Sequence, residues 1–464
     1  MPPPPRHGWR VTRRDYKLDA MRIFISGDGE SGTHLAKLLS AENQDVIIMG
    51  NDEARLGNLD ARYNMITAEG NPLSVTDLRR AGADSADLFV AVNRRAPVNI
   101  TACQLAKMLG ALSTVARVDA GEFLKPPTSD FFNSTGVDTL LFPELLAAYE
   151  VRMALKVNWA KSWFELHEGQ LTVLGVKLDA CSPLAGIQLK DLVQAKRIFH
   201  VAAIKRGRQT IIPRGSDYLL AGDIVYLVTT PEGLPGMPAR CGRTQAKVKR
   251  VMIAGGDKFT RVLVRELSHD YSITVVEPDR TLCRRIAELG CDVNIVNADY
   301  RNIEVLRDEN LDSMDAFLAF SGSTETNIVS SMVAREFGVR IIMADIEDIQ
   351  YIAEAESLNI DKVINKKLIT SSHILRHVLG RDVSTTQVLS LEDAEVAEIV
   401  VAEGARVTLK QVKDLKLSRS MTIAGLIRGG SGVLVDGNTL IRPGDHVVVV
   451  CLNGHLHAIE RLFG

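Results

Sequence analysis

The stretch Arg22-Ile-Phe-Ile-Ser-Gly-Asp-Gly-Glu-Ser-Gly32 decides the fold of this chain. It opens with a mostly apolar run that ends at a glycine, which predicts a buried parallel strand over Arg22–Ser26. The residues that follow place Leu35, Leu38 and Leu39 at helical spacing. A strand, a G-x-G-x-x-G loop and a helix in this order predict the first unit of a doubly wound parallel sheet with right-handed crossovers.

Each glycine of the loop has its own physical role. Gly27 allows a tight turn, Gly29 allows a pyrophosphate to approach closely, and Gly32 allows the helix to pack on the strand. The start of the helix offers N–H groups and a positive dipole end to phosphate oxygens. Two interpretations stay open: a bare tight turn, or a phosphate-binding loop formed by Gly27, Asp28, Gly29, Glu30, Ser31 and Gly32.

An acid usually ends the second strand of such a unit, where it binds a ribose hydroxyl. The second strand is predicted over Asp45–Met49, and Gly50 stands where the acid would be. Asp52 lies two residues further on and could substitute only if the loop curls back. The first unit is therefore expected to have a phosphate loop without a ribose anchor.

The same pattern recurs in the second half of the chain. At an offset of 228 residues, Arg22–Gly27 matches Arg250–Gly255 and Asp87–Val92 matches Asp315–Phe320. At an offset of 222, Arg206-Gly207 and Gly222-Asp223 match the residues at 428–429 and 444–445. The chain is thus predicted to be a tandem duplication of a two-domain unit, α/β in class. Each Rossmann-like parallel sheet is followed by a small strand-rich α+β domain.

The second copy keeps different parts of the site. Its loop begins with Gly255, but Asp257 and Thr260 replace the other two glycines. An aspartate in this place would repel a pyrophosphate and block its approach. The second strand of this copy does end with the acid, Glu277, at the position equivalent to Gly50. We interpret the second copy as structural, with a degenerate site.

Composition limits the function classes. The chain has 464 residues, 46% of them hydrophobic and 24% charged, with a formal net charge of −2. Near-neutrality removes the simplest signature of a nucleic-acid partner, and none is expected. No apolar run approaches the roughly 18–20 residues that span a bilayer. Six cysteines without a CxxC pair are typical of a reduced, cytoplasmic protein.

This order of pieces resembles the TrkA family of bacterial Trk potassium-uptake regulators, built from paired RCK domains. The resemblance extends from about Met21 to the C-terminus. It rests on Met21–Gly32, Ala86–Val92, Asn99, Ala116–Val118, Val251–Gly256, Val275–Asp279, Thr324–Asn327, Ile204–Arg206, Ile211–Pro213 and Arg442–Asp445.

The family resemblance implies a function for these residues. RCK domains of this family bind NAD(H) or adenine nucleotides such as ATP and ADP. Asn71 would lie beside the base, and Arg117 would face the phosphates, although by itself Arg117 is equally an exposed charge at a strand end. The full set of predicted nucleotide-binding residues is Gly27, Asp28, Gly29, Glu30, Ser31, Gly32, Asp52, Asn71, Asn93, Arg117, Glu277 and Asp299.

The chain also departs from the family pattern. Ala96 and Pro97 replace an acidic pair ahead of Asn99, and Asp345 takes the place of Arg117 in the second copy. Loss of the acid at Gly50 weakens selectivity for NAD and would suit a ligand held mainly by its phosphates, such as ATP or ADP.

The resemblance also implies partners. The chains would form a homo-oligomer, a tetrameric ring, beneath a separate TrkH/TrkG-like membrane subunit that conducts K⁺. The protein would then be cytoplasmic and peripheral on the inner face of the plasma membrane. Nucleotide binding would rearrange the ring and gate the pore.

The predicted domains follow the chain in order. They are a disordered extension at 1–20, a Rossmann-like domain at 21–143, a crossover helix at 144–160, a first small lobe at 161–232, a linker at 233–247, a second Rossmann-like domain at 248–370, a connecting helix at 371–383 and a second small lobe at 384–464. Met1–Ala20 carries four prolines and five basic residues, so a functional basic arm is the alternative there. The helix over Pro143–Lys156 could pack on its own domain or cross to a partner chain, and the family favours the second.

Parts of the sequence are also compatible with two other functions. The glycine loop alone would permit an NAD-dependent oxidoreductase, but the small strand-rich pieces lack a proton-transfer cluster, so no enzyme is predicted. A constitutive structural subunit with two inactive sites is the third option. No metal site is expected: His34, His167, His200 and His269 are isolated in sequence, and His373 with His377 lacks a third ligand.

Overall fold

The computed structural model describes residues 21–41, 44–60, 63, 65–167, 169–192, 198–207, 209–358, 360–379, 385–391, 394–452 and 462–463. The chain divides into two compact units, Met1–Phe142 and Pro143–Gly464. The predicted extension Met1–Ala20 lies outside the described residues.

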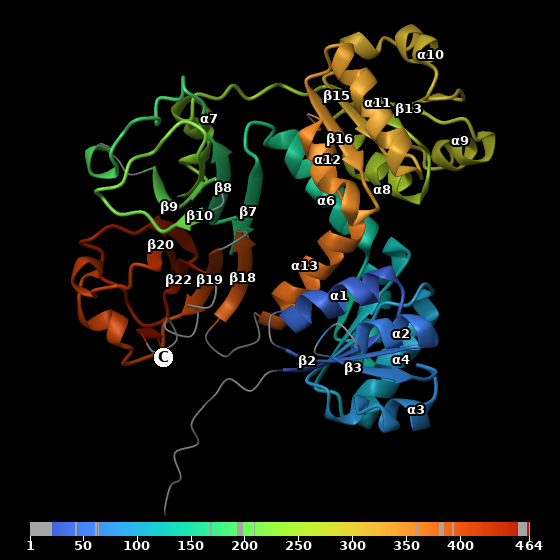
Figure 1. Ribbon diagram of the computed structural model, residues 1–464, viewed down its shortest axis with the longest axis horizontal. Helices are drawn as coiled ribbons and strands as arrows, with labels where there is room; N and C mark the ends of the chain where they lie inside the picture. The colour runs from blue at the N-terminus through green and yellow to red at the C-terminus, as the bar shows by residue number, and fades with distance from the viewer. Residues whose placement is uncertain are drawn as a thin grey trace, which may run out of the picture. The chain divides into compact units, whose positions relative to one another are not determined.

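A parallel six-stranded sheet forms the centre of the first unit (Figure 1). Its strand order, β3-β2-β1-β4-β5-β6, is that of doubly wound dinucleotide-binding folds, which confirms the predicted fold class. The strands are β1 (Arg22–Ser26), β2 (Asp45–Gly50), β3 (Ile66–Glu69), β4 (Leu88–Ala91), β5 (Ser113–Arg117) and β6 (Thr139–Leu141).

Helices connect these strands. They are α1 (Glu30–Ala41), α2 (Glu53–Asp60), α3 (Val75–Arg80), α4 (Ala96–Leu109) and α5 (Thr128–Ser134). Ile23, Phe24 and Ile25 on the central strand β1 are fully buried, as expected for a strand covered on both faces. The strand order reverses between β1 and β4, so the loop after β1 lies at the edge where such sheets bind ligands.

The second unit repeats this sheet in the order β14-β13-β12-β15-β16-β17. Its strands are β12 (Arg250–Ala254), β13 (Ser272–Val276), β14 (Asn294–Val296), β15 (Ala316–Ala319), β16 (Ile341–Asp345) and β17 (Lys362–Ile364). The helices are α8 (Lys258–Leu267), α9 (Arg280–Ala287), α10 (Ile303–Asp308), α11 (Thr324–Glu336) and α12 (Ile352–Ser357).

Two antiparallel five-stranded sheets form the small lobes. The first lobe has the order β10-β9-β11-β8-β7 and the second β21-β20-β22-β19-β18, which is the same topology. The strands of the first are β7 (Ser162–Leu166), β8 (Leu171–Lys177), β9 (Phe199–Arg206), β10 (Gln209–Ile211) and β11 (Ile224–Thr229). Those of the second are β18 (Thr385–Leu391), β19 (Ala394–Val400), β20 (Met421–Arg428), β21 (Ser431–Leu434) and β22 (His446–Leu452).

An arginine–aspartate pair explains why the same residues recur in both lobes. Arg206 donates through Nε and Nη2 to Asp223 at 2.8 and 2.7 Å, and Arg428 binds Asp445 in the same way at 2.8 and 2.6 Å. Burial acts to raise the pKa of Asp445, but the hydrogen bonds from Arg428 and the Arg442 N–H, together with the charges of these two arginines, hold the pKa below its usual value. Each pair fastens the turn before the last strand to a neighbouring strand.

The two lobes share one apolar core. Val173 and Ala203 of the first sheet pack in the same cluster as Val396 and Val448 of the second. In addition, Thr422 on β20 contacts His200 on β9. The lobes therefore pack through equivalent strands of the repeat.

The helix α6 (Pro143–Lys156) packs on the second parallel-sheet domain of the same chain. Its buried residues Ala147, Val151 and Leu155 join the core that contains Leu263 and Leu267 of α8. It also contacts α13 (Lys366–Leu379). Within the chain, α6 thus packs on the second parallel-sheet domain, a surface that the sequence did not identify, because helical spacing shows which face is apolar but not which surface covers it.

The predicted linker at 233–247 is partly structured. The short helix α7 (Met237–Arg240) lies within it, and Met237 and Cys241 are buried in the core of the first lobe. These two side chains lie four residues apart, so both reach the same core from one helical turn.

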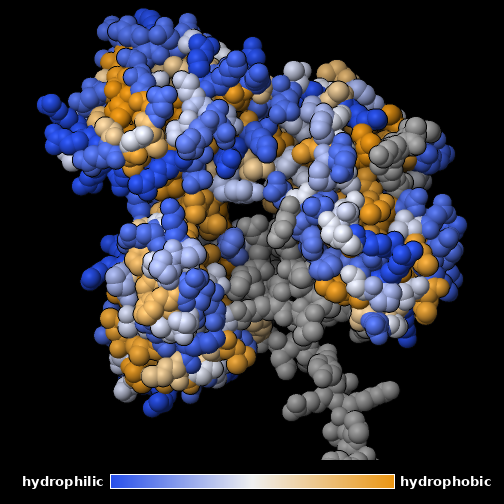
Figure 2. Space-filling view, turned by 180° about the vertical axis from the view of Figure 1, so that it is seen from behind, coloured by the Kyte–Doolittle hydropathy of each residue, from blue (hydrophilic) through white to orange (hydrophobic). Residues whose placement is uncertain are grey.

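Of the helices that the structure describes, none combines the length and the apolar character needed to cross a membrane. On the face shown in Figure 2, hydrophilic side chains are interspersed with small groups of apolar ones.

Candidate functional site: the glycine loops and a histidine–glutamate cluster

Two glycines of the first loop are required by the fold itself. Gly27 has φ of 125°, in the left-handed region, and its N–H donates to the carbonyl of Met49 at 2.8 Å. A Cβ at Gly32 would overlap the Gly27 carbonyl. These two residues give the turn and the close packing of α1 on β1.

Gly29 differs from both, because nothing in the fold requires a glycine there. Apart from Gly29 and its two neighbours in the chain, no heavy atom of the described residues lies within 4 Å of a Cβ built on Gly29, and its φ lies outside the left-handed region. The missing side chain leaves open space beside the first turn of α1, where Glu30 and Ser31 begin the helix. This geometry favours a phosphate-binding loop over a bare tight turn.

Asp28 places a carboxylate at the end of β2. Its Oδ2 accepts hydrogen bonds from the backbone N–H groups of Asn51 at 2.8 Å and Asp52 at 2.7 Å. A Cβ at Gly50 would overlap the Asp28 side chain. Position 50 is therefore glycine because Asp28 occupies the adjacent space, and the end of β2 does carry an acid, supplied by the loop.

The second copy shows the reverse arrangement. Glu277 directly follows β13, and Gly256 stands at the position of Asp28. A Cβ at Gly256 would lie 2.7 Å from Cγ of Glu277. Glu277 Oε1 accepts from the N–H of Asp279 at 2.7 Å, as Asp28 accepts from the equivalent Asp52. Burial raises the pKa of Glu277. Both copies thus place a carboxylate at the end of the second strand. In the first copy the glycine loop supplies it, and in the second copy the residue after the strand does.

Other predicted residues of the first copy take part in local turns. The Oδ1 atom of Asp52 accepts from the N–H of Arg55 at 3.0 Å, and the Arg55 side chain donates to the Asp28 carbonyl at 3.0 Å. Asn71 accepts from the N–H of Leu73 at 2.9 Å, directly after β3. The carboxylate of Asp52 therefore binds the start of α2 directly and is connected to the glycine loop only through Arg55.

A buried asparagine connects the strand ends around the loop. Asn99 is fully buried; its Oδ1 accepts from the N–H of Asn93 at 2.8 Å. Its Nδ2 donates to the carbonyls of Asn93 at 3.0 Å and Arg117 at 2.8 Å. Asn93 in turn donates to the Ser26 carbonyl at 3.1 Å. The ends of β1, β4 and β5 are held together in this way.

Arg117 is the last residue of β5. Asn99 fixes its carbonyl, and the residue is partly buried. Within the part of the chain that the structure describes, no acidic side chain forms an ion pair with its guanidinium. A planar cation held at this strand end is suited to bind phosphate oxygens.

The second copy keeps the asparagine and reverses the charge. Asn327 bonds the N–H of Ser321 at 2.9 Å and the Asp345 carbonyl at 2.7 Å, as Asn99 does at the equivalent positions. The Asp345 carboxylate forms an ion pair with Lys366. Burial raises the pKa of Asp345 to about 6, although Lys366 acts in the opposite direction.

In the second copy, hydrogen bonds and ion pairs between side chains already occupy the groups around the glycine loop. Asp257 caps α8 by accepting from the N–H of Thr260 at 3.0 Å. Glu144 on α6 pairs with Lys258 at 2.8 Å. Asp299, the counterpart of Asn71, binds the Arg301 side chain instead, with Nη2 to Oδ2 at 2.8 Å.

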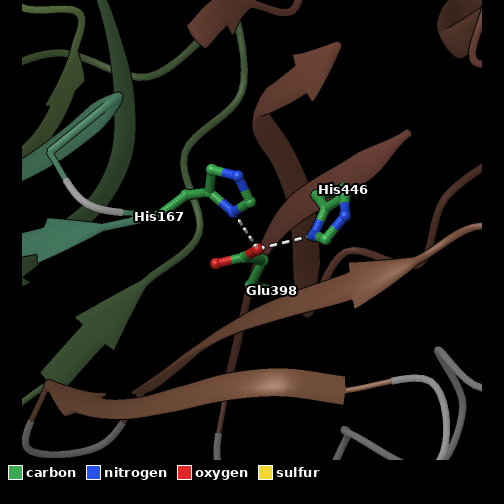
Figure 3. A group of neighbouring side chains, drawn as sticks. All are labelled: His167, Glu398 and His446. Atoms are coloured by element: carbon green, nitrogen blue, oxygen red, sulfur yellow. Dashed lines mark hydrogen bonds and ion pairs between the residues drawn. The ribbon is translucent and has the colours of Figure 1, made fainter. Parts of the chain in front are cut away.

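A third group of polar side chains was not anticipated from the sequence. His167, Glu398 and His446 converge where the two small lobes meet (Figure 3). The Nδ1 atoms of His167 and His446 lie 2.9 and 2.8 Å from Oε1 of Glu398. The sequence signal is weak: β19 is mostly apolar but carries two glutamates, Glu395 and Glu398, and only Glu398 belongs to the cluster. The side chain of His377, paired with His373 in the sequence, lies outside the described residues.

Comparison with known proteins agrees with the repeat. The family model described as the TrkA-N domain matches residues 23–143 and 251–366, and that of the TrkA-C domain matches 173–237 and 396–464. The Trk system potassium uptake protein TrkA of Vibrio alginolyticus is 29% identical over 452 residues, covering 96% of this chain and 98% of the relative. TrkA homolog 1 of Methanosarcina mazei is 28% identical over 454 residues, covering 96% and 100%.

Solved structures show the same fold. The GsuK RCK domain has a TM-score of 0.59 at 14% identity and covers 96% of this chain and 95% of that chain. The GsuK channel bound to NAD has a TM-score of 0.60 at 14% identity, covering 96% and 79%.

Fold and site together define a tandem RCK protein with Rossmann-like domains of the nucleotide-binding type. Within that class, the chain belongs to the TrkA family. The relatives carry the names of potassium-uptake proteins and not of enzymes, in agreement with the prediction that the chain is not an enzyme.

In the first copy the acid stands at position 28 and the glycine at position 50, and the second copy has the reverse. The free energy of unfolding tests whether these two positions depend on each other. Gly50→Glu alone is expected to lower the free energy of unfolding by roughly 1–3 kcal/mol, because its side chain overlaps Asp28. The double variant Asp28→Gly/Gly50→Glu reproduces the second copy and should recover most of that loss. Urea denaturation measures both, and a double variant no more stable than Gly50→Glu would contradict the exchange.

Proposed function

We propose that the first parallel-sheet domain binds a nucleotide, NAD(H) or ATP/ADP, at the loop Gly27–Gly32. The observation that carries this proposal is Gly29, whose missing side chain no packing or backbone requirement explains. A ligand that approaches the backbone closely accounts for it. The GsuK channel, which shares the fold, has been solved bound to NAD.

The residues of the first copy fit such a ligand. The N–H groups at the start of α1 and the guanidinium of Arg117 would bind the phosphates. The Asp28 carboxylate would accept from a ribose hydroxyl through Oδ1, since its two hydrogen bonds from backbone N–H groups of the described residues both use Oδ2. Asn93 and Asn71 would line the site, with Asn71 beside the base, and Asp52 would position Arg55 next to the loop.

In the second copy we propose a structural role. Asp257 already caps the helix that would receive phosphate, and Asp345 with Lys366 replaces the cation of the first copy by a closed ion pair. Although Glu277 and Asp299 stand at ribose and base positions, the carboxylates of Asp257 and Asp345 would repel a phosphate. The chain would therefore hold one nucleotide.

For the role of the protein in the cell, we propose that this chain regulates Trk-type potassium uptake. Membership of the TrkA family supports this, together with a site suited to a nucleotide rather than to chemistry on a substrate. The partner would be a TrkH/TrkG-like K⁺-conducting membrane subunit, and the chain would act as a tetrameric ring on its cytoplasmic face. A nucleotide would change the state of the ring by binding one arrangement more tightly than another.

Calorimetric titration with ATP, ADP, NADH and NAD⁺ tests the site. Gly29→Asp is expected to weaken binding at least about tenfold, because its carboxylate enters open space beside the phosphates without disturbing the fold. Gly57→Asp is the matched control, since Gly57 lies on exposed α2 with similarly open surroundings among the described residues. Equal affinity of Gly29→Asp and the parent, or no binding of any of the four nucleotides, would refute the proposal.

The role of Asp28 is tested by removing the ribose hydroxyl from the ligand. The parent should bind ATP more tightly than 2′-deoxy-ATP, and Asp28→Asn should reduce this difference because a neutral amide is a weaker acceptor. The measurement is the ratio of the two dissociation constants in each protein. An unchanged ratio would assign Asp28 to loop structure alone.

A further inference from the structure

The cluster of His167, Glu398 and His446 joins the two small lobes. His167 lies in the turn after β7 of the first lobe, with φ of 48°. Glu398 lies on β19 and His446 begins β22, neighbouring strands of the second lobe. Figure 3 shows the three side chains pointing toward one another from these separate elements.

The geometry of the cluster brings three ligand-type atoms around one point. Both histidines direct Nδ1 to the same oxygen, Oε1 of Glu398, and the three atoms lie within 4.8 Å of one another. The two rings meet edge to face at 67°, with centroids 4.8 Å apart, so they do not stack. In a tetrahedral site with bonds of about 2.1 Å, ligand atoms lie roughly 3.4 Å apart. Small side-chain rotations from the present hydrogen bonds reach that spacing.

Burial and charge favour a cation at this point. The Glu398 side chain is 3% exposed, and a carboxylate withdrawn from water is stabilised by a nearby positive charge. The histidines are 33% and 29% exposed, which leaves a route for an ion and room for a water ligand.

The repeat supplies an independent observation. Strand register places Gly175 of the first lobe at the position of Glu398, and Ile224 at that of His446. The first lobe therefore builds the same sheet without these polar groups. The fold of a small lobe therefore does not require Glu398 or His446. Folding alone does not explain why these two side chains meet His167.

We propose that His167, Glu398 and His446 bind a divalent transition-metal ion of the Zn²⁺ class, with water as the fourth ligand. Two imidazole nitrogens and one carboxylate oxygen match zinc, whereas Mg²⁺ and Ca²⁺ prefer oxygen ligands alone. Each neutral imidazole would bind through Nδ1 and carry its hydrogen on Nε2. Because the ligands come from both lobes, the ion would fasten the two copies of the repeat together.

The test uses the full chain, stripped of metal with a chelator, in a Cys181→Ser background that removes an exposed thiol. Calorimetry should show one Zn²⁺ per chain, and Co²⁺ should give the visible absorption of a four-coordinate site. His167→Ala and His446→Ala should each weaken Zn²⁺ binding at least tenfold. Zn²⁺ should raise the melting temperature of the parent and not of these variants.

The matched control is His200→Ala. His200 also bridges the lobes, through Thr422 at 3.3 Å, but lies outside the cluster. This variant should bind Zn²⁺ as the parent does. Absence of Zn²⁺ binding by the parent, a six-coordinate Co²⁺ spectrum, or equal affinity of His167→Ala and His200→Ala would overturn the proposal. The parent's Co²⁺ spectrum decides the matter even where a variant fails to fold.

Discussion

A buried amide holds each nucleotide-type domain of this protein together at its functional edge. Asn99 joins the ends of β4 and β5, and Asn93 extends the connection to β1. Asn327 makes the same bonds in the second copy. Each buried backbone N–H or C=O group that is left without a hydrogen bond lowers the stability of the fold by about 1–3 kcal/mol. The shape of the edge that faces a ligand therefore depends on this one side chain in each copy.

On that common frame the two copies carry opposite charges at the strand end that the asparagine binds. In the first, Arg117 is the strand-end residue whose carbonyl the asparagine binds, and the helix start beside Gly29 lies open. In the second, Asp345 occupies the same position, is paired with Lys366, and the helix start is capped by Asp257. An anion would be attracted to the first edge and repelled at the second. The duplication has thus kept one scaffold, and the proposed division into a binding copy and a structural copy rests on this difference in charge.

Much of the fold could be predicted from the sequence because its signals are local. Apolar runs ended by glycine gave the strands around Gly27 and Gly255, and the constant offset between the halves gave their order. Contacts between distant residues could not be predicted. The contact between Asp28 and Gly50 depends on the direction in which a loop side chain points. The packing of α6 depends on which surface covers its apolar face. His167 and Glu398 are 231 positions apart, and nothing local links them.

The central claim is that one of the two copies binds a nucleotide. The most direct measurement is the number of nucleotides bound per chain at saturation, by equilibrium dialysis with the tightest-binding of the adenine nucleotides. The account predicts one per chain, held by the copy that contains Gly29 and Arg117. Two per chain would contradict it, because Asp257 and Asp345 would then have to accommodate a second set of phosphates.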